Sequence, residues 1–205
     1  MKALKFTLLI LMLLPLTLRV KADNNDTSGV SYFLIAKTHL ENMLNGKEPM
    51  SYEEAIYQIE NAWYGGGLDY ASYKNVLNIH TKNICKLICS YLDASKMNPK
   101  SDLTGSAAQK REYYINAAFN CAIYRYITDT SFWIEDGQLF SHKAYHYSTK
   151  DPMGTMDWTN TQVTHLLNEN HGNCFALASL FKIFSERLNS DARLCSSPGH
   201  IYTPR

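Results

Sequence analysis

Clusters of positive charge are absent from this chain. Its 20 Lys and Arg residues are nearly balanced by 19 Asp and Glu residues, and the basic residues form no extended run. Basic and aromatic residues do not alternate densely in any segment either. Because proteins bind phosphate backbones with concentrated Lys and Arg, this composition excludes a nucleic-acid partner.

Several other familiar patterns are also missing. The chain has no internal repeat of fixed period and no low-complexity linker, and its hydrophobic content of 45% is that of an ordinary globular protein. The glycine triplet at 65–67 lacks the Gly-Lys-Ser continuation of a phosphate-binding loop, so we interpret it as a helix stop and turn. A length of 205 residues allows one domain with an N-terminal extension.

The N-terminus resembles a leader for export. Residues 1–5 are basic, residues 6–18 are largely apolar, and small or branched residues precede a cleavage point after Ala22. The apolar run falls short of the ~20 residues that span a bilayer, although basic residues beside the cut leave a retained anchor as an alternative. We predict a signal peptide over 1–22, a periplasmic or extracellular location and no stable membrane insertion after cleavage. Its removal would leave a net charge of −3.

The cysteine count is odd. The five cysteines are Cys85, Cys89, Cys121, Cys174 and Cys195, so an oxidising compartment leaves at least one free thiol. Cys85 and Cys89 share one face of a predicted helix and are poorly placed to bridge each other. They are expected to be buried, or one could pair with Cys121. A zinc site built on them would lack a second ligand pair.

Hydrophobic periodicity indicates an α+β protein with a helical first half. The predicted helices of this half cover 32–44, 70–92 and 107–127, and a further one follows a capping box of Ser51 and Glu54 and ends near 63–64. The second half combines a hairpin around Asp136 and Gly137, helices and short strands. Its predicted helices and strands cover 161–167, 174–188, 192–195 and 200–203. We therefore expect a helical region over 23–129 and a separate core over 130–205.

The same periodicity predicts which helix faces are buried. In the helix over 70–92 the expected inward residues are Val76, Ile79, Ile84, Leu87, Ile88 and Tyr91. In the helix over 107–127 they are Tyr114, Ala118, Cys121, Ala122 and Tyr126.

The segment around Cys174 has the pattern of a thiol nucleophile. Asn173 is a good helix cap, Cys174 follows in the first turn, and the helix is apolar almost all round, which predicts burial. The helix dipole favours thiolate over thiol, and the free N–H groups of the first turn could stabilise an oxyanion. His200 opens a later strand and could accept the Cys174 proton and return it to a leaving group.

These segments resemble the transglutaminase-like superfamily, which has a papain-like fold. The resemblance is carried over about 158–205 by Gly172-Asn173-Cys174, the Ala/Leu/Phe-rich helix, Glu186-Arg187-Leu188, Asp191-Ala192-Arg193 and Gly199-His200. It implies that Cys174 is the nucleophile and His200 the base, on a buried helix packed on an antiparallel sheet.

The family's third catalytic residue, an Asp or similar, lies on the strand after the histidine. We expect that strand beyond residue 205; otherwise the site works as a dyad or the protein is inactive. Loss of the orienting carboxylate costs about 10⁴-fold in related triads.

Further site residues are expected around this pair. Trp158 and Asn173 are candidate binding residues, with Trp158 walling the cleft or donating from its indole; a Trp packed in the core is the alternative. His171 is expected to point elsewhere. A metal site drawn from His165, His171, Cys174, Cys195 and His200 has no compact ligand spacing, so we expect no metal and no cofactor.

The sequence therefore predicts an exported, thiol-dependent acyl transferase or hydrolase. Its substrate would be a protein or peptide, attacked at a peptide bond or a side-chain amide. The alternative is a transglutaminase-like interaction module that has lost its catalytic triad.

Overall fold

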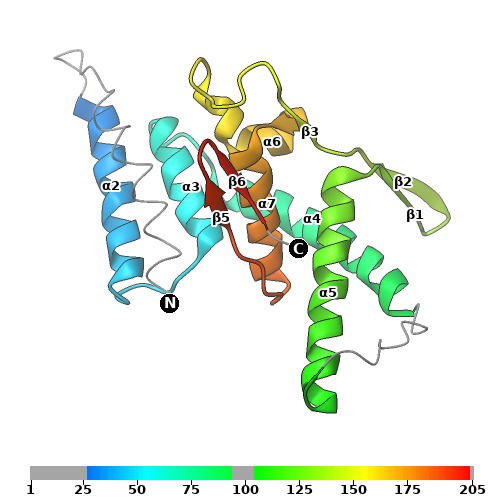
Figure 1. Ribbon diagram of the computed structural model, residues 1–205. Helices are drawn as coiled ribbons and strands as arrows, with labels where there is room; N and C mark the ends of the chain where they lie inside the picture. Colours follow the sequence, from blue (N-terminus) through cyan, green and yellow to red (C-terminus); the bar gives the residue numbers. More distant parts are fainter. Residues whose placement is uncertain (1–26, 94–103, 204–205) are drawn as a thin grey trace. The chain divides into compact units, whose positions relative to one another are not determined.

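The computed structural model describes residues 27–93 and 104–203, and it is a mixed α+β structure as the sequence predicts (Figure 1). The predicted signal peptide over 1–22 lies outside the described residues. Within the described part, no helix combines the length and apolar character needed to cross a membrane.

The chain divides into two compact units, one up to Tyr70 and one from Ala71 onward. This division differs from the boundary expected between residues 129 and 130. It follows the packing, because the helix at 107–128 lies against the helix that begins at Cys174.

The first unit is a pair of helices. α2 (Thr27–Leu44) packs against α3 (Tyr52–Trp63). α3 begins where predicted, because the Ser51 hydroxyl accepts the Glu54 N–H at 3.1 Å. The glycine triplet forms the turn after α3, and Gly66 has a φ of +81° there. A side chain at Gly66 would collide with the Tyr32 ring, so glycine is required for two reasons.

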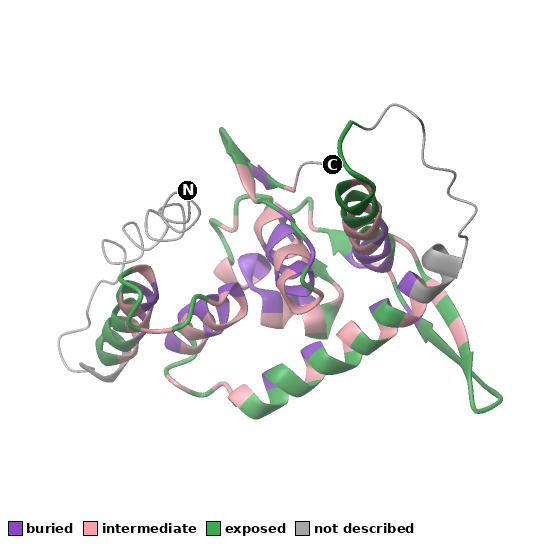
Figure 2. Ribbon diagram, turned by 90° about the horizontal axis from the view of Figure 1, so that it is seen from below, coloured by how far each residue is buried: buried purple, intermediate pink, exposed green. Residues whose placement is uncertain are grey.

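The second unit is built around α7 (Cys174–Arg187). Residues on most sides of α7 are buried, as its apolar composition predicts (Figure 2). The other helices of the unit are α4 (Tyr70–Asp93), α5 (Ala107–Thr128), the 3-10 helix η1 (Trp158–Thr161) and α6 (Val163–Glu169). Of the elements described in this unit, α5, α6, η1 and the last strand pack on α7.

The strands form three separate two-stranded sheets in the described part of the chain. β1 (Ser131–Glu135) and β2 (Gln138–His142) form the predicted hairpin, with left-handed backbone at Asp136 and Gly137. β3 (His146–Tyr147) pairs in parallel with β4 (His171–Gly172). β5 (Cys195–Ser197) pairs antiparallel with β6 (His200–Tyr202). The strand expected over 192–195 therefore begins only at its last residue.

The predicted buried faces are partly wrong. Ile79 is 52% exposed, whereas the buried residues described on α4 are Tyr73, Leu77, Ile84 and Ile88. Ile84 and Ile88 are therefore buried as predicted, whereas the first half of α4 buries Tyr73 and Leu77 instead of Ile79. Cys121 is exposed on α5, because the buried stripe runs through Ala118, Ala122, Ile123, Tyr126 and Ile127. Cys85 is exposed as well.

A phenylalanine pair tests this assignment of the core. Phe184 is 0% exposed in α7, whereas Phe132 in β1 is 64% exposed. Phe184→Ala should lower the free energy of unfolding by about 3–5 kcal/mol through lost burial and a residual cavity. Phe132→Ala should change it by less than about 0.5 kcal/mol. Urea unfolding of both variants measures the difference, and similar losses would contradict a core centred on α7.

Candidate functional site

Cys174 is the first residue of α7 and is half-buried. The helix starts here because the Asn173 side-chain oxygen accepts the N–H groups of Phe175 at 2.9 Å and Ala176 at 3.2 Å. The Leu177 N–H bonds to the Asn173 carbonyl at 3.1 Å. Two N–H groups that the sequence offered as oxyanion donors are therefore already occupied. These two groups are bonded to the side chain that caps the helix, so they are not available to an oxyanion.

Asn173 is held on its other side as well. It is 2% exposed, its amide nitrogen donates to the Pro152 carbonyl at 3.2 Å, and its N–H donates to the Asn160 carbonyl at 2.8 Å. Both ends of the side-chain amide are engaged inside the protein. Asn173, expected as a binding residue, thus has the geometry of a helix cap and a tether.

The turn that receives this tether is organised by a buried carboxylate. Asp151 accepts the backbone N–H groups of Thr155, Met156 and Asp157, each at 2.9 Å. These bonds, with that from Asp157 the strongest influence, lower the pKa of the Asp151 carboxyl. The Asn160 amide donates to the Asp151 carbonyl. The 151–160 segment is therefore held by polar contacts within itself.

Tyr147 lies beside Cys174, on the strand that pairs with the residues preceding α7. Its register partner is Gly172, and the next N–H, that of Ser148, donates to the Gly172 carbonyl at 2.8 Å. Burial, and then the negative charge of the Cys174 thiolate, raise the pKa of the Tyr147 phenol. Because Tyr147 is 45% exposed and its strand pairs with the residues just before Asn173, we refer to it as the Tyr147 wall of the Cys174 site.

Sequence analysis did not single out Tyr147. A two-residue parallel pairing carries no periodicity, and the residues it joins are far apart in the chain. Gly172 is a weak signal. A side chain there would lie 3.0 Å from Ala176 and 3.3 Å from the Asn160 carbonyl, so a close approach of backbone requires glycine.

His200 is not joined to Cys174 by any hydrogen bond described between these two residues. It is exposed, and its ring stacks on Tyr202 with centroids 6.0 Å apart. The intervening Ile201 is 7% exposed in a strand that packs on α7. Because side chains alternate along a strand, His200 and Tyr202 occupy the opposite face from Ile201. The expected proton transfer thus requires a rearrangement of the His200 side chain.

The turn before His200 nevertheless lies close to the Asn173 tether. A side-chain carbon at Gly199 would be 3.9 Å from the sulfur of Met153, the residue after Pro152. The β5–β6 hairpin and the cap of α7 therefore meet at the same 151–154 turn.

The remaining predicted residues surround this region. Trp158 is half-buried and opens η1, which packs on α7. His165 and His171 have ring centroids 5.0 Å apart, and His171 bonds through Nδ1 to the Glu169 carbonyl at 3.1 Å. Across residues 27–93 and 104–203, no three His, Cys, Asp or Glu side chains are arranged to hold a metal ion.

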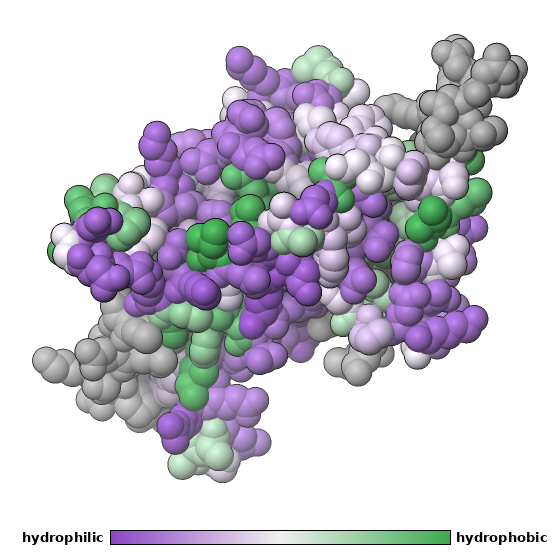
Figure 3. Space-filling view, turned by 180° about the vertical axis from the view of Figure 1, so that it is seen from behind, coloured by the Kyte–Doolittle hydropathy of each residue, from purple (hydrophilic) through white to green (hydrophobic). Residues whose placement is uncertain are grey.

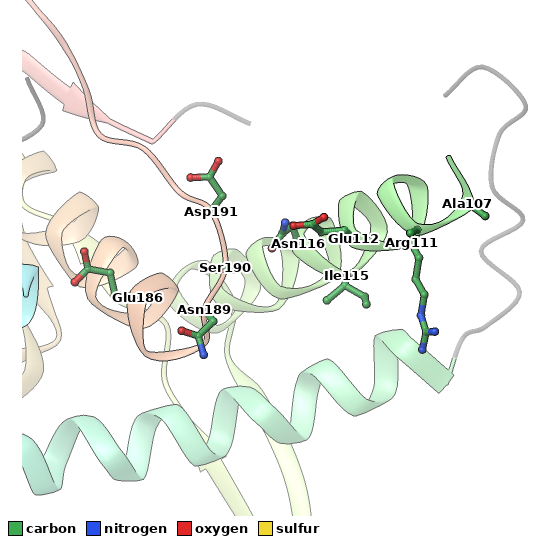
Figure 4. Close-up of a pocket in the computed structure, with 10 residues that line it drawn as sticks. Ala107, Arg111, Glu112, Ile115, Asn116, Glu186, Asn189, Ser190 and Asp191 are labelled. Carbon is green, nitrogen blue, oxygen red and sulfur yellow. The ribbon is translucent and has the colours of Figure 1, made fainter. Parts of the chain in front are cut away.

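A hollow of about 880 Å³ lies elsewhere, between the first half of α5 and the end of α7 (Figure 4). Its lining carries charges of both signs, from Arg111, Glu112, Glu186 and Asp191, and includes none of the predicted site residues. Figure 3 shows a further face, on which hydrophobic residues form small patches among hydrophilic ones.

The comparisons leave the family of the chain open. No protein-family model, no curated protein and no solved structure matches it. The site must therefore be interpreted from its own geometry.

Replacing Asn173 tests the cap. Asn173→Ala should lower the free energy of unfolding by about 1–3 kcal/mol, because the cap and the Pro152 bond are both lost. Asn173→Ser keeps a capping oxygen and loses the amide donor without adding a charge, so its loss should be smaller. Urea unfolding compares the two. Equal losses would mean that capping contributes nothing.

Replacing Asp151 tests the turn through pH. The lowered pKa means that the ionised carboxyl stabilises the fold above its unfolded value of 3.8, and that this contribution disappears as pH falls through the folded value. Asp151→Asn should therefore lower the urea midpoint at pH 7, and the difference from wild type should narrow below about pH 4. Asp191→Asn, at an exposed carboxylate, is the matched control. A difference that stays constant with pH would contradict this account.

Proposed function

We propose that the protein is an exported, thiol-dependent acyl transferase or hydrolase that acts on an amide bond, with a papain-like core of the transglutaminase-like type. The observation that carries the proposal is the position of Cys174. It is a half-buried thiol at the first position of a buried helix, and a capped backbone on one side and Tyr147 on the other hold its surroundings.

The proposed chemistry needs only groups of this chain and water or an amine. His200 takes the Cys174 proton, the sulfur attacks the amide carbonyl carbon, and the imidazolium returns the proton to the leaving amine. Water or a second amine then cleaves the acyl-thioester and regenerates the thiol. Tyr147, which remains protonated at neutral pH, can donate a hydrogen bond to the oxyanion in place of the capped N–H groups.

His200 must turn toward Cys174 for this reaction. Support for such a turn comes from its neighbourhood: the imidazole is exposed, and the preceding Gly199 meets Met153 at the edge of the Cys174 region. Catalytic hydrogen bonds commonly tighten only when substrate is bound.

Alkylation of the thiols tests the proposal directly. Iodoacetamide should label Cys174 faster than the exposed Cys121 in the same molecule, and the excess should persist below about pH 7. His200→Ala should reduce that excess and lower turnover of peptide and glutamine amides by about 10²–10⁴-fold. Cys174→Ser should abolish turnover, and His171→Gln is the control for loss of a nearby imidazole.

One observation favours a non-catalytic alternative. The His200–Tyr202 stack lies on the strand face opposite Ile201, which suits a binding surface as well as a resting enzyme. In an interaction module, iodoacetamide would label Cys174 no faster than Cys121, and His200→Ala would change the labelling rate of neither thiol. That outcome would replace the enzyme proposal with the interaction module.

A further inference from the structure

A buried histidine, His142, and a half-buried one, His80, lie together in the second unit, away from the proposed catalytic residues. His80 of α4 and His142 of β2 have ring centroids 5.5 Å apart. His142 is 9% exposed and stacks on Tyr126 of α5 at 3.9 Å, and His80 Nδ1 is hydrogen-bonded to the Tyr126 hydroxyl at 2.7 Å. Phe184 of α7 closes the cluster, with its ring 6.2 Å from His80.

Among the described residues, the cluster contains no negatively charged side chain that could balance the positive charge of a protonated imidazole. Burial lowers the pKa of both histidines to about 4, and for His142 the charge of His80 adds to this effect while a backbone bond to Tyr126 opposes it. No described carboxylate contributes to either value. Two buried polar atoms, His142 Nε2 and the Tyr145 hydroxyl, have no described hydrogen-bond partner.

Charged and titratable side chains on the surrounding elements are engaged elsewhere or uncharged. The phenols of Tyr126 and Tyr145 have pKa values raised by burial, so they stay neutral. The ionic groups nearby in sequence pair as Lys86 with Glu135, Arg125 with Asp129, and Lys182 with Glu186, while Arg187 bonds Asn78 and Lys143 is exposed.

A short segment connects this cluster to Cys174. His142 ends β2, and the Tyr145 N–H donates to the Ile127 carbonyl of α5 at 2.9 Å. The His146 N–H then donates to the Asn170 carbonyl at 2.8 Å, and Tyr147 reaches the wall of the Cys174 site. The burial of the His142 and Tyr145 side chains in the core therefore also positions Tyr147.

We propose that the His80–His142 pair is an acid-sensitive anchor for the 142–147 segment. When both imidazoles take up protons, the segment is released, and with it the Tyr147 wall of the Cys174 site. The consequence for catalysis rests on the proposed function, whereas the release of the segment does not.

The direction follows from proton linkage. The pKa of a histidine is near 6.5 in the released state and near 4 in the anchored state, so the released state binds more protons at intermediate pH. The histidine pair therefore anchors the 142–147 segment fully above about pH 6.5, and the anchoring weakens as pH falls toward 4. Between pH 6.5 and 4.5 each histidine favours release by roughly 40-fold.

Hydrogen exchange of the full chain tests the release. After correction for the intrinsic rate, amides of 142–147 should lose protection by at least about tenfold between pH 6.5 and 4.5, whereas amides of 180–184 in α7 should stay protected. His142→Phe, which keeps the stack on Tyr126 and cannot be protonated, should reduce the loss. His165→Gln, which also removes one histidine, should leave it unchanged. Unchanged protection in wild type, or the same loss in His142→Phe, would overturn the proposal.

A second measurement keeps the proposal falsifiable if His142→Phe does not fold. Proton NMR of the wild-type imidazoles should show two histidines that stay neutral at pH 6. A titration midpoint above about pH 6 for every histidine would overturn the proposed anchor. Failure of the proposed function has a different outcome: 142–147 would still open in acid, while Cys174 would label no faster than Cys121 at any pH.

Discussion

The start of α7 depends on one buried side chain, and the candidate site depends on the start of α7. Asn173 caps the helix, bonds Pro152 and receives the turn organised by Asp151, and each of these contacts is polar and largely withdrawn from water. An unsatisfied buried donor or acceptor costs about 1–3 kcal/mol, so the turn and the helix end stabilise each other and neither is independently replaceable. η1, the β5–β6 turn and the Cys174 thiol lie around this contact.

That arrangement carries a conflict between structure and chemistry. A strong cap satisfies the N–H groups of a first helical turn, and those same groups are what an oxyanion would use. Because the N–H groups of Phe175 and Ala176 are bonded to Asn173, a substrate at Cys174 cannot use these two donors. Tyr147 is the neighbour that can supply one, since its raised pKa keeps the hydroxyl protonated. The cap at the helix start thus removes two backbone donors from the reach of an oxyanion, and a side-chain hydroxyl can replace one of them.

The elements with strong local patterns were predictable from sequence. The long helices follow hydrophobic periodicity and caps such as Ser51, and the β1–β2 hairpin follows Asp136 and Gly137. The β3–β4 pairing has no such pattern, because it joins distant two-residue segments, and Tyr147 was missed with it. For His200 the information was present, since apolar Ile201 between two polar-tipped rings predicts that His200 faces away from the core. The packing of His80 and His142 also required the tertiary structure, because single histidines in a sequence do not reveal what surrounds them.

Cys174 lies between two segments that different chemistry holds in place. The 142–147 segment is anchored by neutral imidazoles, and the 151–157 turn by an ionised carboxylate. Acid weakens both anchors, but not together: the histidines favour the open state below about 6.5, whereas Asp151 keeps its charge until the pH falls below 3.8. Between these limits the Tyr147 wall can loosen while the Asn173 cap, and therefore the position of the thiol, stays fixed. The two sides of the site are thus separable by pH because one depends on groups that must remain uncharged and the other on a group that must remain charged.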